Sequence, residues 1–185
     1  MPHVREVLLR ILCVCALAAV AAGVLAQVAS AACDGGNTVP TADNLPQVRH
    51  ATLCLLNRQR RLHGLSALRS NADLQRGAEA YSAEMVQGGF FAHVSPRGST
   101  LLSRVRGTGY LSRGHSTTLG ENLAWGSGDL ATPSSTVRAW MHSSGHRRNI
   151  LTASFRDIGI GIAIGAPVPQ PGLSAATYTT DFGTG

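Results

Sequence analysis

The octapeptide Ile158–Gly165, IGIGIAIG, is the feature that most restricts how this chain folds. In an extended strand alternate side chains point to opposite faces, so the isoleucines share one face and Gly159, Gly161 and Ala163 share the other. The isoleucine face predicts burial against an apolar core. The face that carries almost no side chains allows another layer to approach the backbone closely. The octapeptide therefore predicts a sheet with a second layer packed tightly against it.

Helical segments precede this strand. Asn44 is expected to cap a first helix, which has Pro46 in its first turn and ends at Gly64. A second helix begins at Ser70 or Asn71 and stops at Gly88-Gly89. Apolar residues recur near the helical period in both segments: Val48, Ala51, Leu55 and Leu62 in the first, and Leu74, Ala78, Tyr81 and Met85 in the second. Both helices are therefore expected to pack one face against the sheet.

The rest of the chain completes a small α+β domain. A short helix is predicted around residues 101–106, and strands are predicted at 117–126 and 174–182. A third helix starts at Thr132-Pro133 and is expected to run into residues 136–151, where its C-terminal end carries His146. We find no internal repeat and no second domain. Helices that flank a small, mostly antiparallel sheet make a single layered α+β domain.

The N-terminal segment has the layout of a secretory signal. A short basic start precedes an uncharged run from Ile11 to Ala29, and Ala29-Ser30-Ala31 offers a cleavage site between small residues. An uncleaved run of this length would instead serve as a membrane anchor. We therefore expect residues 1–31 to be a signal or anchor, residues 32–43 a polar tether, and residues 44–185 the folded domain.

The number and positions of the cysteines are consistent with an exported protein. Cys13 and Cys15 lie in the signal segment, so Cys33 and Cys54 remain in the exported chain. Two cysteines in an exported protein most simply pair with each other. That bond would tie the tether to the first helix and contribute about 3 kcal/mol of stability.

The charge of the chain is positive, with a formal net charge of +6. A basic domain is able to bind nucleic acid, but export makes anionic envelope polymers or lipid head groups the expected contacts. We therefore expect no nucleic-acid partner. Nothing in the sequence indicates an oligomer, and we expect a monomer.

His142 and His146 have the i, i+4 spacing of some zinc-ligand pairs. The protease motif with this spacing carries a glutamate between its histidines, which acts as the general base. Here the intervening residues are Ser143, Ser144 and Gly145, which favour a helix end and provide no base. The stretch therefore does not predict a zinc protease of that type, and His142 is expected at the surface or at a cleft rim.

Several motifs together resemble the CAP superfamily, which includes cysteine-rich secretory proteins, insect venom antigen 5 and plant pathogenesis-related proteins. The motifs are LLNRQRRLHGLSAL, LQRGAEAYSAEM, FFAHVSP, GENLAWG, AWMHSSGHRRNIL with FRDIGIGIA, and YTTDFG, in that order between residues 48 and 183. The likeness is greatest to short bacterial members. The resemblance implies an α-β-α sandwich with a cleft formed by two histidines and two acids.

Residue by residue, the resemblance assigns the cleft to His93, Glu121 and His146. The second acid of the family pattern falls at Ser143, whose hydroxyl cannot supply a negative charge. Asn122 is expected beside the cleft, where it hydrogen-bonds backbone and orients the strand. Two imidazoles and one carboxylate are able to hold Zn²⁺ or another divalent ion with water at the open position. The same three residues would otherwise form a buried polar cluster that joins strand to helix.

The function implied by the resemblance is that of an exported protein that acts by binding a lipid, an envelope polymer or another protein. A lipid ligand predicts an apolar groove near Phe90, Phe91 and Tyr110. The alternatives are a metal-dependent hydrolase or protease that uses the same cleft, and a purely structural envelope module. The missing second acid and the lack of an evident general base weigh against an enzyme.

Overall fold

The computed structural model describes residues 33–113 and 118–184. The predicted signal segment, residues 1–31, lies outside the described residues. The chain divides into Met1–Asp34 and Gly35–Gly185, and every helix and strand given below belongs to the second unit. Among the described residues, no helix combines the length and apolar character needed to cross a bilayer.

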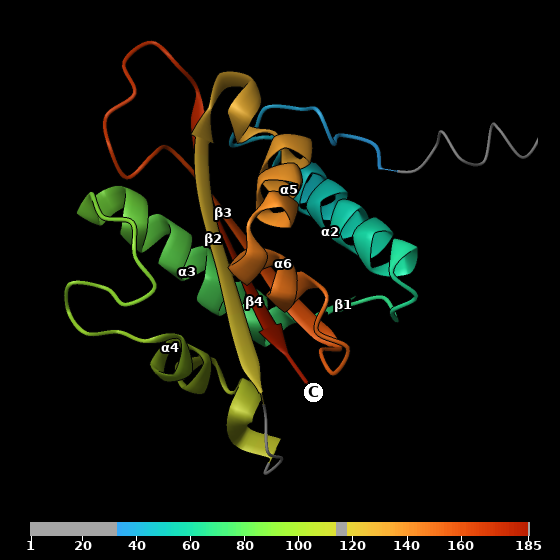
Figure 1. Ribbon diagram of the computed structural model, residues 1–185. Coiled ribbons are helices and arrows are strands. Elements are labelled where there is room, and N and C mark those ends of the chain that lie inside the picture. Colours follow the sequence, from blue (N-terminus) through green and yellow to red (C-terminus); the bar gives the residue numbers. More distant parts are fainter. Residues whose placement is uncertain (1–32, 114–117, 185) are drawn as a thin grey trace, which may run out of the picture. The chain divides into compact units, whose positions relative to one another are not determined.

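A four-stranded sheet forms the middle of the Gly35–Gly185 unit (Figure 1). Its strands are β1 (Arg69–Ser70), β2 (Leu119–Ser127), β3 (Asp157–Ile164) and β4 (Ala175–Gly183), in the spatial order β1-β3-β4-β2. Only the two-residue strand β1 runs parallel to its neighbour, and the pairs β3–β4 and β4–β2 are antiparallel. The prediction of a small, mostly antiparallel sheet is confirmed.

Helices cover both faces of this sheet. They are α2 (Leu45–Leu62), α3 (Ala72–Gly88), α4 (Leu101–Thr108), α5 (Pro133–His142) and α6 (Ser144–Ile150), with short 3₁₀ turns at Tyr110–Arg113 and Gly128–Ala131. Figure 1 shows α3 and α4 on one side of the sheet and α2, α5 and α6 on the other. This is the expected α-β-α sandwich.

The glycine face of β3 packs against the backbone of α3. A Cβ atom placed on Gly159 would lie 2.1 Å from the carbonyl carbon of Leu74, and one on Gly161 would lie 2.1 Å from that of Ala78. No side chain fits in that space, because real Cβ atoms do not approach backbone so closely. The close approach predicted from the octapeptide is confirmed.

The isoleucine face of β3 lies in the main apolar core. Ile158, Ile160 and Ile162 are at most 5% exposed, whereas Ile164, at the end of the strand, is 42% exposed. The core around them comes from α2, α5, α6 and β4, and includes Leu56, Val137, Trp140, Ile150, Tyr178 and Phe182. Trp140 also donates from Nε1 to the carbonyl of Leu123 on β2 at 2.9 Å, which ties α5 to the sheet edge.

The first helix buries the predicted stripe at Val48 and Ala51 but departs from it toward its C-terminal end. Leu62 is 70% exposed, while Arg60 is fully buried. The Arg60 guanidinium donates to the backbone carbonyls of Ser66, Ile150, Thr152 and Phe155 at 2.8–3.2 Å. A buried cation is tolerated when its donors are satisfied. Arg60 therefore joins the end of α2 to the segment that links α6 to β3, a role that apolar periodicity does not reveal.

Two local predictions have different outcomes. Cys33 and Cys54 are both disulfide-bonded, as expected from their pairing in the exported chain. Asn44 precedes α2 but does not cap it, since its Oδ1 accepts from the backbone N–H of Thr41 at 2.8 Å instead.

Candidate functional site

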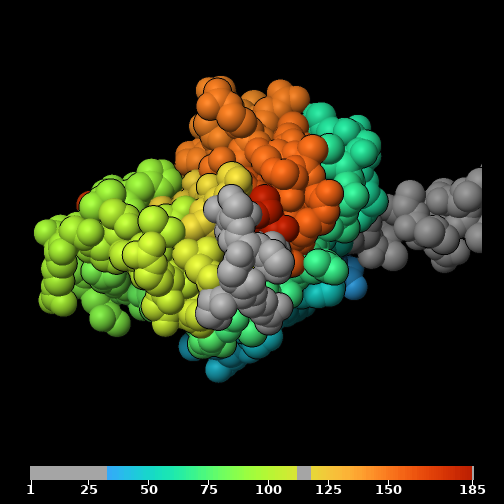
Figure 2. All heavy atoms as spheres, turned by 90° about the horizontal axis from the view of Figure 1, so that it is seen from below, coloured from blue at the N-terminus to red at the C-terminus, as the bar shows by residue number. Residues whose placement is uncertain are grey.

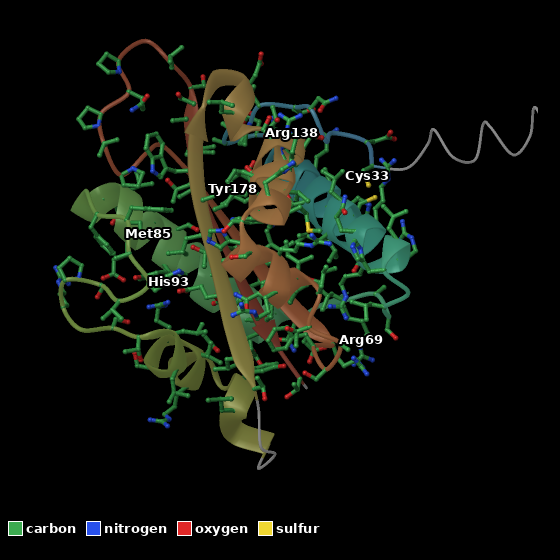
Figure 3. The ribbon with its side chains drawn as sticks, viewed as in Figure 1. Cys33, Arg69, Met85, His93, Arg138 and Tyr178 are labelled. Carbon is green, nitrogen blue, oxygen red and sulfur yellow. The ribbon has the colours of Figure 1, made fainter. Side chains whose placement is uncertain are left out.

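The predicted residue His93 lies on the loop between α3 and α4 (Figure 3). α3 ends because Gly89 adopts a left-handed conformation with φ 61°, which releases the chain into this loop. The Tyr81 hydroxyl, from α3, donates to the carbonyl of Ala92 at 2.6 Å. This bond fixes the residue next to His93 against the helix.

His93 and Glu121 are in direct contact. Nδ1 of His93 lies 2.7 Å from Oε1 of Glu121, and the side chain of Glu121 is only 3% exposed whereas that of His93 is 57% exposed. Glu121 comes from β2, the last strand in the sheet order. The carboxylate is therefore buried, while the imidazole that it holds faces outward.

Arg104, from α4, completes the cluster and was not predicted. Its Nη2 donates to Oε2 of Glu121, so each carboxylate oxygen has a partner. The guanidinium also lies over the Tyr81 ring, 3.3 Å from the ring centroid, and Nη1 donates to the Ser99 carbonyl at 3.1 Å. α4 holds this arginine in place because Thr100 and Ser103 form a capping box at its start. We call His93, Glu121 and Arg104 the polar cluster.

An unexpected second acid lies beside the polar cluster. Asp181, on β4, is directly opposite Glu121 in the β2–β4 ladder and is fully buried. Neither Asp181 oxygen has a hydrogen-bond partner among the described residues. Burial, and then the negative charge of Glu121, raise the pKa of Asp181 well above its ordinary value. Asp181 therefore keeps its proton at a pH where an exposed aspartate is ionised.

His146 does not reach the cleft by the route that we predicted. The helix that begins at Pro133 stops at His142, because Ser143 adopts an extended conformation with φ −102° and ψ 121°. His146 lies on the separate short helix α6. The prediction that His146 lies at the end of the helix from Pro133 is wrong, whereas the Ser-Ser-Gly sequence does end that helix, as expected.

Asparagines attach α6 to the strand that carries Glu121. Asn122 donates to the carbonyl of His146 at 3.1 Å, and Asn149 donates to the carbonyl of Glu121 at 3.0 Å and to Oδ1 of Asn122 at 2.8 Å. Asn149 thus bonds to β2 from the last turn of α6. His146 is half-buried, and burial, followed by the charge of nearby His93, lowers its pKa. The imidazole of His146 therefore stays neutral to a lower pH than that of an exposed histidine.

The described residues do not form an evident metal centre. Within residues 33–113 and 118–184, no three His, Cys, Asp or Glu side chains are grouped so as to hold an ion. The Arg104 cation occupies one oxygen of Glu121 and His93 the other. A carboxylate already paired with a guanidinium is a poor ligand for a second cation, so these contacts do not fit a resident divalent ion. Metal binding by His93, Glu121 and His146 stays a prediction.

The other residues that we predicted for the site are not part of the polar cluster. Ser143 joins α5 to α6 and is half-buried, and its side chain makes no capping hydrogen bond. His142 is exposed, with Nδ1 bonded to the Arg138 carbonyl at 2.7 Å. Tyr110 does not line a groove with the two phenylalanines, because it is buried against Leu74 and Val105. Phe90 packs on Tyr81 instead, and Phe91 is 45% exposed.

The comparisons with known proteins assign the family. Residues 53–170 match the sequence profile of the CAP group, described as the cysteine-rich secretory protein family. The chain is 36% identical over 107 residues to the uncharacterized protein YkwD of Bacillus subtilis, and 30% identical over 112 residues to the uncharacterized membrane protein YlbC of the same bacterium. These alignments cover 58% and 60% of this chain but only 39% and 30% of the relatives. The chain belongs to the cysteine-rich secretory protein family.

Solved structures agree with the fold. An extracellular protein with an SCP domain from Bacillus anthracis superposes with a TM-score of 0.58 at 25% identity, over 77% of this chain and 43% of that one. An outer surface protein of Borrelia burgdorferi gives a TM-score of 0.58 at 16% identity, over 79% and 98%. A cysteine-rich secretory protein of Staphylococcus aureus gives 0.53 at 18%, over 79% and 40%. The last two similarities bear on the fold alone.

Proposed function

We propose that this chain is an exported protein that binds a ligand at the surface around His93, and that it is not a hydrolase. Export is supported by the signal-like sequence, by the disulfide and by the extracellular SCP-domain protein to which the fold is similar. The ligand class stays open among a lipid, an envelope polymer and a protein.

One observation carries the proposal: within the polar cluster, the Glu121 carboxylate is neutralised by Arg104. A general base must be free to take a proton from water or substrate. Both oxygens of Glu121 are engaged, one by His93 and the other by the Arg104 cation. His93 is held by this network and is still 57% exposed at its side chain. An exposed imidazole that is held in place by the buried carboxylate of Glu121 is suited to binding a ligand through hydrogen bonds.

The test compares how strongly variants of two exposed histidines bind candidate ligands. The probes are isolated cell-wall material and lipid vesicles, and binding is measured by co-sedimentation with wild type, His93→Ala and the matched control His50→Ala. His50 is exposed on α2. We expect His93→Ala to weaken binding about tenfold and to lower the melting temperature, because an oxygen of buried Glu121 loses its partner, and we expect His50→Ala to bind like wild type. Equal binding by all three proteins would overturn the proposal.

A metal-dependent hydrolase is the second candidate. It is favoured by His146, whose lowered pKa keeps the imidazole in the neutral form that metals require. Zinc titration by calorimetry on wild type, His93→Ala and His146→Ala separates the two functions. We expect no hydrolysis that a chelator abolishes, with or without a bound ion. A single site that is lost in both variants, with hydrolysis abolished by a chelator, would instead establish the enzyme.

A further inference from the structure

The short helix α6 presents two arginines to solvent. Its inner side is attached to the sheet, where Asn149 bonds to β2 and Ile150 is fully buried. Arg147 and Arg148 are exposed on the other side. A hollow of about 370 Å³ lies there, lined by Met141, His142, Ser144, Arg147, Arg148 and Leu151. We call it the cationic hollow, because both of its arginines are positively charged and no acidic residue lines it.

No carboxylate compensates the charge of the cationic hollow. Among the described residues, neither Arg147 nor Arg148 forms an ion pair with an acid. The helices on this side of the sheet, α2, α5 and α6, contain no aspartate or glutamate, whereas α3 on the opposite side contains three. Asp129 precedes α5 and so lies at the other end of that helix, about 15 Å long, from His142. The surface around the hollow therefore has a potential of one sign, which attracts anions.

Arg147 is held in place by α2. Its Nη2 donates to Nε2 of His63 at 3.2 Å, while Nδ1 of His63 bonds to the Gln59 carbonyl at 2.8 Å. Because an arginine only donates, His63 accepts at Nε2 and is neutral. In Figure 2 the orange surface of the α5–α6 region adjoins the teal surface of α2, in agreement with this contact. Arg147 is thus oriented by a neighbouring helix without losing its charge.

Arg138 extends the row of positive charges along α5. It lies four residues before His142, so the two side chains are on the same side of the helix, and Nδ1 of His142 bonds to the Arg138 carbonyl at 2.7 Å. Arg138, labelled in Figure 3, is exposed, and its Nη2 donates to Oγ of Ser135 at 3.2 Å. Arginines spread over two helices suit a ligand with several linked negative charges better than one small anion.

The lining of the cationic hollow distinguishes between classes of polyanion. Guanidinium groups match the geometry of phosphate oxygens and bind them through paired hydrogen bonds. The hollow is lined by no phenylalanine, tyrosine or tryptophan, on which the bases of a single-stranded nucleic acid would stack. Its apolar side chains, Met141 and Leu151, are partly buried against the core and leave little surface for an acyl chain. These features favour linked phosphates that carry neither bases nor acyl chains.

We propose that Arg138, Arg147 and Arg148 bind an extracellular polymer whose repeating units are joined by phosphodiesters, such as poly(glycerol phosphate). Successive phosphates of one polymer chain would contact the arginines of α6 and α5. The inference rests on the export of the chain, which is part of the proposed function. It does not rest on ligand binding at His93, which lies on the loop between α3 and α4, the helices that cover the opposite face of the sheet (Figure 1).

The experiment measures binding of soluble poly(glycerol phosphate) to the purified protein by calorimetry over a range of salt concentrations. The variants of the site are Arg147→Gln/Arg148→Gln and Arg138→Gln. The matched control, Arg97→Gln/Arg106→Gln, removes the same charge from exposed arginines elsewhere. These side chains are all exposed, so the melting temperatures of the variants should stay close to that of wild type. His93→Ala tests whether the polymer binds at the surface around His93 instead.

We expect Arg147→Gln/Arg148→Gln to weaken polymer binding at least about tenfold at low salt, because both charge-assisted contacts to phosphate are lost. The slope of log affinity against log salt concentration should become shallower by about one, since fewer counterions are released from the polymer. Arg138→Gln should weaken binding about threefold in the same salt-dependent way. The control pair and His93→Ala should bind within a factor of about two of wild type.

Other results would overturn the inference in distinguishable ways. Equal weakening by the control pair would mean unspecific charge attraction. Weakening by His93→Ala alone would place the polymer at the surface around His93, which would support the proposed function but not this site. No polymer binding by wild type would remove the inference and leave the His93 surface untouched. Tighter binding of a single-stranded oligonucleotide or of phosphatidylglycerol vesicles, with the same dependence on Arg147 and Arg148, would assign the surface to a nucleic acid or a membrane.

Discussion

The two faces of the sheet pack by opposite means. On the α3 face, Gly159 and Gly161 bring two backbones into contact, and the buried charged groups Glu121, Arg104 and Asp181 lie among small apolar clusters that include Leu74, Tyr81 and Met85. On the other face, isoleucines fill the space between the sheet and helices α2, α5 and α6 with apolar side chains. The first face offers little room for adjustment, whereas an apolar core adapts to small changes of volume.

This difference explains where the polar cluster lies. The Tyr81 ring supports Arg104 only if α3 stays close to the sheet, since Tyr81 is on α3 and Glu121 is on β2. Tyr81 follows Ala78, whose backbone meets Gly161, by about one helical turn. The glycine face therefore sets the position of α3 and, through it, the geometry of the polar cluster.

The largest effect is expected from Gly161→Val. The new side chain has to displace Ala78, whose backbone would lie 2.1 Å from the added Cβ, so α3 must move away from the sheet. We expect the free energy of unfolding to fall by about 4 kcal/mol or more. Urea denaturation measures this loss, and binding by the His93 surface should fall with it.

The control for this variant is Ile160→Val on the opposite face. Ile160 is 5% exposed in the apolar core, and deletion of one methylene there should cost about 1 kcal/mol. Similar losses for the two substitutions would show that the faces do not differ in the way described.

Arg60→Met is the second-largest expected change and tests the apolar face. It leaves carbonyls of Ser66, Ile150, Thr152 and Phe155 without their donor. We expect a loss of about 3 kcal/mol in the free energy of unfolding, because buried acceptors without partners keep their desolvation cost. Hydrogen exchange should report early opening of residues 150–155. A loss below that of Ile160→Val would mean that methionine replaces the guanidinium without cost.

The elements that depend on local signals could be predicted from the sequence. Asn71 caps α3 by accepting from the N–H groups of Asp73 and Leu74, and Thr132 caps α5 in the same way through Ser135. Alternation along β3 predicted both of its packing surfaces. In each case the determining groups lie within a few residues of one another, so the pattern is visible in the linear chain.

The features that were missed arise between distant segments. Arg60 meets acceptors about ninety positions away, and Arg104 reaches Glu121 from α4, so no spacing in the sequence announces either contact. The second acid was sought at Ser143, next to the predicted histidines, whereas Asp181 comes from the closing strand. Strand alternation does place Asp181 on the face of Thr179, toward α3, but its register with Glu121 requires the folded sheet.

Asp181→Asn is expected to have the smallest effect on the free energy of unfolding. Because this effect depends on pH, it distinguishes the α3 face, which holds Asp181, from the apolar face. Asp181 has a pKa raised by burial and by Glu121, so its folded form favours the protonated acid. The stabilisation linked to that proton is complete below the unfolded pKa of 3.8 and is lost as the pH rises toward the folded pKa. Asparagine is neutral at every pH and escapes this loss. We therefore expect Asp181→Asn to match wild type near pH 4 and to become more stable than wild type as the pH rises to neutral. Denaturation over this range measures the difference between the two proteins, which should grow by no more than about 1.4 kcal/mol per pH unit.

The same comparison in a Glu121→Gln background should show a smaller difference, since one cause of the raised pKa is removed. A stability difference independent of pH would mean that Asp181 is ionised in the fold, and that the α3 face holds a charge that none of its neighbours satisfies.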